Sequence, residues 1–206
     1  MADNVEIDPA GLSMVAMYDL LSRLVVPRPI ALVSSLSAAG VPNLAPFSFF
    51  MVGGANPASL VFCPVRASGG RKKDTLANIE ETGEYVIHLV DRAMTDAMNA
   101  TSASLPPEAS EWGPSGFTPV SSTVVAPKRV AESPVAFEMK LFQIVHHGDG
   151  DGAATYVIGE VVQAHVRVDV WNSGDVRPLQ PISRLGGSGY LDLQAVELFE
   201  LDRPSS

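Results

Sequence analysis

The fold is decided by three successive stretches: Val135-Ala-Phe-Glu-Met-Lys-Leu-Phe-Gln-Ile-Val145, Gly148-Asp-Gly-Asp-Gly152 and Thr155-Tyr-Val-Ile-Gly-Glu-Val-Val162. The first stretch alternates, and one side of the predicted strand carries Val135, Phe137, Met139, Leu141 and Gln143. A long alternating strand, a glycine-rich turn and a second apolar strand predict an antiparallel hairpin of the kind typical of a barrel. The run that follows, residues 164–170, either forms another strand or continues the second one around a bend.

Shorter apolar runs around this hairpin predict further strands at residues 30–34, 42–50, 59–63, 84–90 and 195–201. Turns are expected at residues 37–40 and 53–57. Pro46 favours a sheet edge or a bulge for its strand, because proline has no N–H to donate. Helices are expected over residues 9–22 and 92–101. Asp74 or Thr75 is expected to cap a further helix, which covers Leu76, Ile79 and Glu80 and ends at Gly83.

The strands do not alternate regularly with helices, so a parallel βαβ sheet is disfavoured. The expected fold class is all-β with peripheral helices, formed by the 206 residues as a single domain. Residues 1–22 are expected to form an N-terminal extension with a short helix. Residues 102–123 are rich in Ser and Pro and are expected to form an excursion loop, which Trp112 and Phe117 can anchor.

Composition narrows the function classes. The net charge of −9 excludes a whole-chain basic footprint for nucleic acid. The lone cysteine, Cys63, rules out an intramolecular disulfide and reads as a small core residue, and no Cys/His cluster has the spacing of a metal site. No signal peptide and no apolar run approaching a membrane span of about 20 residues is visible, so we expect a cytoplasmic protein without membrane contact.

Three segments favour ligand binding. In residues 42–50, Asn43 and Ser48 stand beside aromatic side chains, which suits a planar ring ligand; the alternative is a core strand with edge contacts. The basic, glycine-rich residues 66–73 lead into a helix, which suits an anion; the alternative is a solvated loop. The glycines of residues 183–190, with Arg184 and Tyr190, allow close approach of a ligand or a partner chain; the alternative is a simple connection.

No motif for a nucleotide triphosphate, a Rossmann dinucleotide site or a serine hydrolase is present. The four histidines lack the acid and nucleophile spacing of a catalytic triad. His88 is expected to be a satisfied strand residue, and His146 and His147 are expected to be exposed. The catalytic residues therefore stay unidentified.

Five motifs in order resemble the flavin-reductase-like, FMN-binding split-barrel family, in its flavoredoxin-like branch: Pro27-Arg-Pro-Ile-Ala-Leu-Val-Ser34, Asn43-Leu-Ala-Pro-Phe-Ser-Phe-Phe50, Lys72-Lys-Asp-Thr-Leu-Ala-Asn-Ile79, Met98-Asn-Ala-Thr-Ser102 and Arg184-Leu-Gly-Gly187. The resemblance implies a six-stranded Greek-key split barrel and a homodimer that binds FMN. It also implies NADH or NADPH as electron donor and a monooxygenase component as a possible recipient of reduced flavin.

Carried over by motif, the residues that the resemblance places around the cofactor are Arg28, Ser34, Asn43, Ala45, Pro46, Phe47, Ser48, Lys73, Thr75, Asn78, Asn99 and Arg184. Two positions depart from the family pattern. Ala154 stands where many flavin reductases have a histidine, and Met51 stands where relatives often have an asparagine. Besides an NAD(P)H-dependent FMN reductase, two alternatives stay open: a flavin carrier reduced by a partner protein, and a non-enzymatic barrel that binds haem or another flavin.

Overall fold

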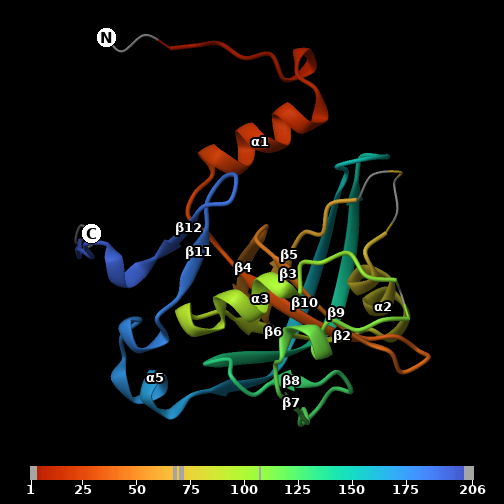
Figure 1. Cartoon of the computed structure of the whole chain (residues 1–206), viewed down its shortest axis with the longest axis vertical. Helices are drawn as coiled ribbons and strands as arrows, with labels where there is room; N and C mark the ends of the chain where they lie inside the picture. Colours follow the sequence, from red (N-terminus) through yellow and green to blue (C-terminus); the bar gives the residue numbers. More distant parts are fainter. Residues whose placement is uncertain (1–3, 67–68, 70–71, 107, 202–206) are drawn as a thin grey trace.

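A β-rich body carries a helix, α1 (Met14–Leu24), that lies near the N-terminus and stands apart from most of the body (Figure 1). The computed structural model describes residues 4–66, 69, 72–106 and 108–201. Ser13 begins α1 by accepting a hydrogen bond from the amide of Ala16. Within the described ranges, no helix is long and apolar enough to cross a membrane.

The main sheet contains seven antiparallel strands in the order β3-β2-β6-β9-β10-β5-β4. Their bounds are β2 (Ala31–Leu36), β3 (Pro42–Phe47), β4 (Phe50–Ala55), β5 (Ala58–Phe62), β6 (Glu84–Leu89), β9 (Val135–His147) and β10 (Ala154–Val166). The resemblance implies six strands. The additional strand is β4, whose second half was expected to be a turn. It pairs with β5, and Gly53 permits this because a Cβ there would lie 2.6 Å from the Ser59 hydroxyl.

The hairpin of β9 and β10 is the longest pairing in the sheet and runs from His147 opposite Ala154 to Val135 opposite Val166. Register shifts between Ile158 and Gly159 and between Val161 and Gln163 bend it, so the expected second and third runs form one bent strand as far as Val166. The first bulge also changes which side chains of β9 face the core. Gln143 is exposed and Ile144 packs on the core instead, which corrects the expected alternation.

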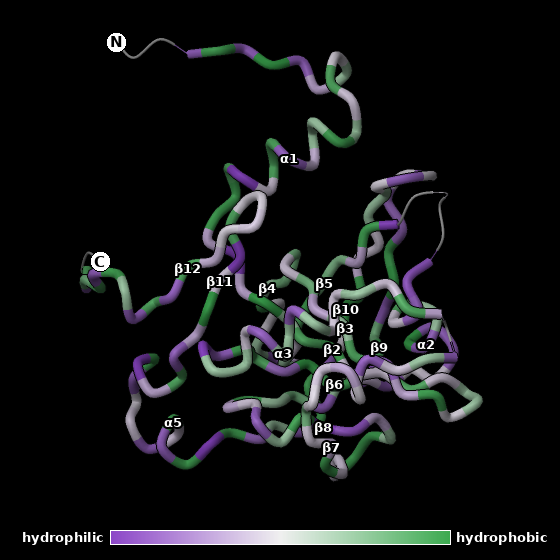
Figure 2. The backbone as a smooth tube through the Cα atoms, in the orientation of Figure 1, coloured by the Kyte–Doolittle hydropathy of each residue, from purple (hydrophilic) through white to green (hydrophobic). Residues whose placement is uncertain are grey.

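Both faces of β2 are buried, because successive side chains point to opposite sides of a strand. Leu32 joins one cluster with Met98, Trp112 and Phe117, whereas Val33 joins the other. The first cluster lies under α3 (Thr95–Ala100) and the excursion, so Trp112 and Phe117 do anchor it. Figure 2 shows hydrophobic segments running through the strands of the body and also along α1.

The second cluster is covered by α2 (Asp74–Thr82), which contributes Leu76 and Ile79. Gly83 ends α2 with a φ of 70°, as expected for a left-handed C-cap. The expected start is wrong in one detail. Lys73 is the N-cap residue, and no side chain caps the helix, so neither Asp74 nor Thr75 holds that position.

A small sheet joins β1 (Arg28–Pro29), β11 (Ile182–Arg184) and β12 (Tyr190–Asp192), with Arg28 opposite Arg184 and Arg184 opposite Tyr190. It brings the C-terminal glycine-rich segment beside the start of the main sheet. The remaining elements are β7 (Pro119–Val120), β8 (Arg129–Val130), α4 (Trp112–Ser115), α5 (Val168–Ser173) and the 3₁₀ turns Pro9–Gly11, Arg92–Met94, Arg177–Leu179 and Leu193–Ala195.

Near the C-terminus, one expected strand ends early, at Val166 instead of residue 170, and another is wrong. After β10 the chain forms α5, which ends at Gly174 with a φ of 63°, so residues 167–170 are not extended throughout. Residues 195–201 form no strand either. Asp192 accepts a hydrogen bond from the Gln194 amide and turns the chain, and Phe199 and Leu201 are left 78% and 84% exposed. β-Propensity alone forms no strand where no neighbouring edge pairs with it.

Candidate functional site

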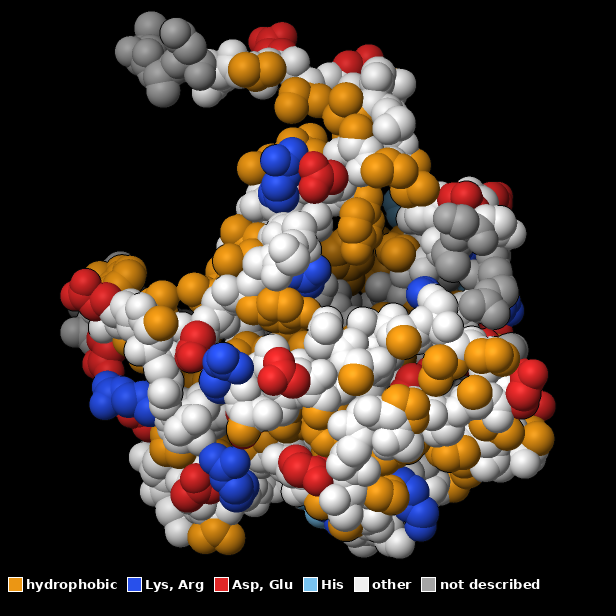
Figure 3. Space-filling model, in the orientation of Figure 1, with side chains coloured by type: hydrophobic (Ala, Val, Ile, Leu, Met, Phe, Trp, Pro, Cys, Tyr) orange, Lys and Arg blue, Asp and Glu red, His pale blue; other side chains and the backbone are white. Residues whose placement is uncertain are grey.

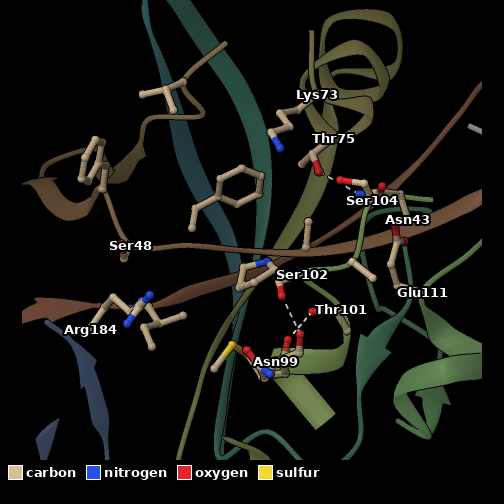
Figure 4. A pocket seen from close by; sticks show the side chains of 18 of the residues that line it. Asn43, Ser48, Lys73, Thr75, Asn99, Thr101, Ser102, Ser104, Glu111 and Arg184 are labelled. Carbon is tan, nitrogen blue, oxygen red and sulfur yellow. Dashed lines mark hydrogen bonds between the residues drawn. The ribbon is translucent and has the colours of Figure 1, made fainter. Parts of the chain in front are cut away.

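A cavity of about 390 Å³ lies between β3, the start of α2, the end of α3 and the hairpin of β11 and β12. Figure 4 shows Lys73 and Thr75 at the start of α2 on one side of it, and Asn99 and Arg184 on the other. This volume is within the range of small-molecule sites in proteins.

The structure brings nine of the twelve expected site residues to this cavity: Asn43, Ala45, Pro46, Phe47, Ser48, Lys73, Thr75, Asn99 and Arg184. Arg28, Ser34 and Asn78 do not line it. They are buried directly behind it, on β1, β2 and α2. The nine lie far apart in the sequence, so their convergence is a property of the fold.

Asn43 and Thr75 form a buried polar centre in the cavity wall. Nδ2 of Asn43 lies 2.8 Å from Oγ1 of Thr75 and 3.4 Å from Oγ of Ser35. Asn78 donates to the same Ser35 hydroxyl at 3.1 Å. Asn78 therefore acts on the cavity through Ser35, and the network holds the start of α2 against the β2–β3 hairpin.

Lys73 supplies positive charge at the uncapped start of α2. Its neighbour Lys72 is committed to Glu80, with 2.6 Å between Nζ and Oε2, whereas Lys73 forms no salt bridge with the described residues. The first amides of a helix and its dipole favour an anion at that end. Positions 67–68 and 70–71 of the expected basic loop lie outside the described residues, so the described part of the anion site is Lys73, Thr75 and the helix start.

Arg28 is a structural centre behind the cavity. Its guanidinium donates to the carbonyl oxygens of Ser22, Val25 and Leu185, and its Nε lies 3.5 Å from the Ser48 hydroxyl. Burial lowers the pKa of Arg28, and its donors are used by the backbone. Arg28 thus ties the end of α1 to the C-terminal hairpin and positions Ser48, which does line the cavity.

Ser34 is almost fully buried on β2, and its hydroxyl has no hydrogen-bond partner among the described residues. Arg184 faces the cavity, and among the residues that the structure describes it forms no salt bridge with an acid. Its guanidinium donates to the carbonyls of Gly187 and Gly189 and lies 4.6 Å from the ring centroid of Tyr190. The stack fixes a cation and an aromatic ring at the cavity rim.

Part of the wall was not expected from the sequence. It comes from the end of α3 and the excursion: Thr101, Ser102, Ala103, Ser104, Leu105 and Glu111. Glu111 is buried, and its Oε2 accepts a hydrogen bond from the Leu44 amide at 3.0 Å. The density of serines after Asn99 was the available signal, but a Ser- and Pro-rich run reads equally well as an ordinary loop.

The histidines and the cysteine show no nucleophilic arrangement. His88 is fully buried, with its Nδ1 2.9 Å from the Leu32 carbonyl and its Nε2 accepting from the Val130 amide, and burial lowers its pKa to about 4. It is the satisfied strand histidine that was expected. His146 and His147 are exposed, also as expected. Burial raises the pKa of the Cys63 thiol, which keeps it protonated, as suits a core residue.

The comparisons with known proteins agree with this geometry. Residues 21–179 match the family model of the flavin reductase like domain. An uncharacterised protein of Halalkalibacterium halodurans is 41% identical over 205 residues, which cover 98% of this chain and 97% of that protein. The chain therefore belongs to the flavin reductase like family, and the suspected resemblance is confirmed.

Solved structures agree with the family. Nitrilotriacetate monooxygenase component B from Bacillus cereus is similar with a TM-score of 0.91 and 35% identity, over 98% of this chain and 100% of that one. The 2-nitrobenzoate 2-nitroreductase of Pseudomonas fluorescens has a TM-score of 0.84 and 31% identity, over 98% and 97%. A Shewanella frigidimarina protein with a split barrel domain, 22% identical with a TM-score of 0.82 over 98% and 100%, shares the fold.

The two departures from the family pattern lie outside the cavity. Met51 is 60% exposed on β4 and lines no part of it. Ala154 is the first residue of β10, and its methyl group also lies outside the cavity wall. The position at which the resemblance implies a histidine thus carries only a methyl group.

Proposed function

We propose that this chain is an FMN-binding flavin reductase that uses NADH or NADPH and passes reducing equivalents to free flavin or to a partner oxygenase. The observation that carries the proposal is the convergence of nine expected residues on one cavity, in a chain of this family. The cavity combines a positive end, a polar centre and a flat apolar wall, which are the three features that a phosphate-bearing flat ring requires.

The side chains present fit FMN. Lys73, the Thr75 hydroxyl and the open start of α2 suit a phosphate, because charge-assisted bonds and the helix dipole both favour an anion there. Ala45, Pro46 and Phe47 suit the face of the ring, and Asn43 and Ser48 suit its polar edge. The bound flavin would supply the redox chemistry, since its ring accepts a hydride from nicotinamide.

The protein's own part is positioning and exclusion of water. The Asn43–Thr75 bond holds the polar centre, and Arg28 holds Ser48. A direct hydride transfer requires no side-chain acid or base, which agrees with the lack of a nucleophilic arrangement among the described residues. The similarity to a monooxygenase component supports a partner oxygenase as acceptor.

We also propose a homodimer. Its support is the apolar surface of α1, where Val15 is 68% exposed and Leu24 69%. Figure 3 shows hydrophobic side chains along this helix. Isolated helices that expose this much apolar surface are stabilised by covering it. Light scattering after gel filtration should give twice the chain mass of 21.8 kDa.

One observation favours the carrier as a second candidate. The methyl group of Ala154 can neither exchange a proton nor hydrogen-bond to the carboxamide of a nicotinamide nucleotide, whereas a histidine side chain can do both. Anaerobic stopped-flow mixing of FMN-loaded protein with NADH, and separately with NADPH, distinguishes the two candidates. Bleaching of the flavin absorbance within seconds supports the reductase. No bleaching with either nucleotide, with dithionite still reducing the flavin, contradicts the reductase and supports the carrier.

A further inference from the structure

A second chamber adjoins the cavity. It has a volume of about 410 Å³ and shares Tyr18, Phe49, Cys63 and Val65 with the first. Its remaining walls come from α1 and from the β9–β10 hairpin: Met14, Met17, Leu21, Gly152, Ala154 and Tyr156. In Figure 3 the surface is hollowed between α1 and the neighbouring part of the body, and hydrophobic side chains line the hollow.

The chamber depends on a close approach between α1 and the hairpin. A Cβ at Gly152, where φ is 74°, would lie 2.7 Å from Cγ of Met14, so glycine is required for this contact. Ala154 leaves room beside it, where a histidine would fill space. The rings of Tyr18 and Phe49, which line both spaces, have centroids 5.8 Å apart and an interplanar angle of 41°.

The side chains that line the chamber are uncharged. None of the ten described lining residues carries a formal charge, and the Cys63 thiol is kept neutral by burial. Three aromatic rings and two methionines offer polarisable contacts to a flat ring. The hydroxyls of Tyr18 and Tyr156 can donate to a carbonyl oxygen. A ligand with phosphates or carboxylates finds no cation among these walls and would pay for desolvation.

We propose that this chamber binds a neutral, flat aromatic carbonyl compound of the quinone class, as an electron acceptor next to the flavin cavity. The proposal rests on the proposed function, which supplies the electrons. The overall reaction balances as NAD(P)H, one proton and the quinone giving NAD(P)⁺ and the hydroquinone. Both quinone carbonyls become hydroxyls, and the nicotinamide is the reductant.

Binding to the whole FMN-loaded protein tests this inference directly. The probe is 2,3-dimethyl-1,4-naphthoquinone, which has no free ring position for thiol addition, measured by isothermal titration calorimetry. The charged probe is 1,4-naphthoquinone-2-sulfonate. The paired variants are Leu21→Glu, inside the chamber, and Phe142→Glu, at an exposed position of β9 outside it and away from α1.

The native protein and Phe142→Glu should bind one neutral quinone per chain. Leu21→Glu should bind it about tenfold or more weakly, because a charge without a partner is costly in an apolar wall. The sulfonate should bind the native protein about tenfold or more weakly than the neutral quinone. FMN affinity should change less than about twofold in both variants, because neither Leu21 nor Phe142 lines the flavin cavity.

Three outcomes would overturn the proposal. The first is equal affinity for both quinones in the native protein. The second is equal quinone binding by the two variants. The third is a loss of quinone binding in Leu21→Glu together with a change in the mass of that variant, which would mean that a second copy of the chain covers the chamber. If the native protein binds the quinone but no FMN, the proposed function fails and the chamber stands.

Discussion

The side-chain amide of Asn43 donates to the hydroxyl of Thr75, with 2.8 Å between Nδ2 and Oγ1, although the two residues lie 32 positions apart on β3 and α2. Both are buried, so the bond is shielded from water. It joins the strand that offers a flat wall to the helix that offers an anion site. The geometry of the cavity depends on it.

Breaking this bond should weaken FMN binding and stability together. Thr75→Val keeps the shape of the side chain and leaves the Asn43 amide without its closest partner. We expect a loss of stability of about 1–3 kcal/mol and at least a tenfold loss of FMN affinity. Urea unfolding and fluorescence titration measure the two, and a cycle with Asn43→Ala should show coupling. Fully additive effects would contradict a functional link between the residues.

Lys73 and Lys72 form a matched pair. Lys73→Ala should weaken FMN binding roughly ten- to hundredfold, because a charge-assisted bond is worth about 1.5–3 kcal/mol, and unfolding should change little. Lys72→Ala removes the same charge from a residue that is already paired with Glu80, so its effect on FMN should be small. If both variants lose FMN affinity equally and salt abolishes both losses, the lysines act through the general electrostatic field of the protein and not through a direct contact with the phosphate.

Glu138 is fully buried, and its carboxylate accepts hydrogen bonds from the amides of Thr123, Val124 and Val125 and from His165. Burial alone would raise its pKa, but these donors lower it below the ordinary value. Since the folded pKa is depressed, the stabilisation is present above the unfolded pKa of about 4.3 and is lost as the pH falls through the folded value.

Glu138→Gln should therefore lower the free energy of unfolding at pH 7 by about 3 kcal/mol and flatten the loss of stability in acid. Glu132→Gln is the control, because Glu132 accepts from the Thr118 amide at an exposed site. Its effect should stay below about 1 kcal/mol. A Glu138→Gln protein with native stability at pH 7 would show that the carboxylate is dispensable.

His88 should cause a second loss of stability in acid. Its pKa is lowered from 6.5 to about 4 by burial. The unfolded chain therefore binds more protons than the folded one between these values, and stability should fall as the pH drops across that window. Urea unfolding at pH 7 and pH 5 should show the decrease, and NMR should show His88 still neutral at pH 5. Titration of the folded-state ring near 6.5 would refute the assignment.

Tyr85 and Gly159 test the packing of the sheet. The Tyr85 hydroxyl is buried without a partner among the described residues, and a Cβ at Gly159 would lie 2.0 Å from it. Gly159→Ala should destabilise the protein by about 1–3 kcal/mol through overpacking. Tyr85→Phe should be neutral or stabilising, because it removes an unsatisfied hydroxyl. The double variant should recover part of the loss, and thermal unfolding measures all three.

Local pattern was enough for most elements. The alternating run from Val135, the turn at residues 37–40 and the left-handed Gly83 all follow from properties of neighbouring residues. The run at residues 195–201 shows the limit of such reasoning. Its composition favours a strand, but the cap at Asp192 turns the chain and no sheet edge receives it. Pairing depends on partners that are distant in sequence.

The sequence by itself determined the strand pattern, the family and the residue types of an anion site beside an apolar wall. Side-chain period, turn chemistry and motif order can be identified from the sequence without knowing which distant segments meet. Only the tertiary structure decided which of those residues meet. It placed Arg28, Ser34 and Asn78 behind the cavity and brought Ser102, Ser104 and Glu111 into its wall. It also set Ala154 in a second, uncharged chamber. Bulges, sheet order and the packing of α1 decide these placements, and each depends on contacts between distant segments.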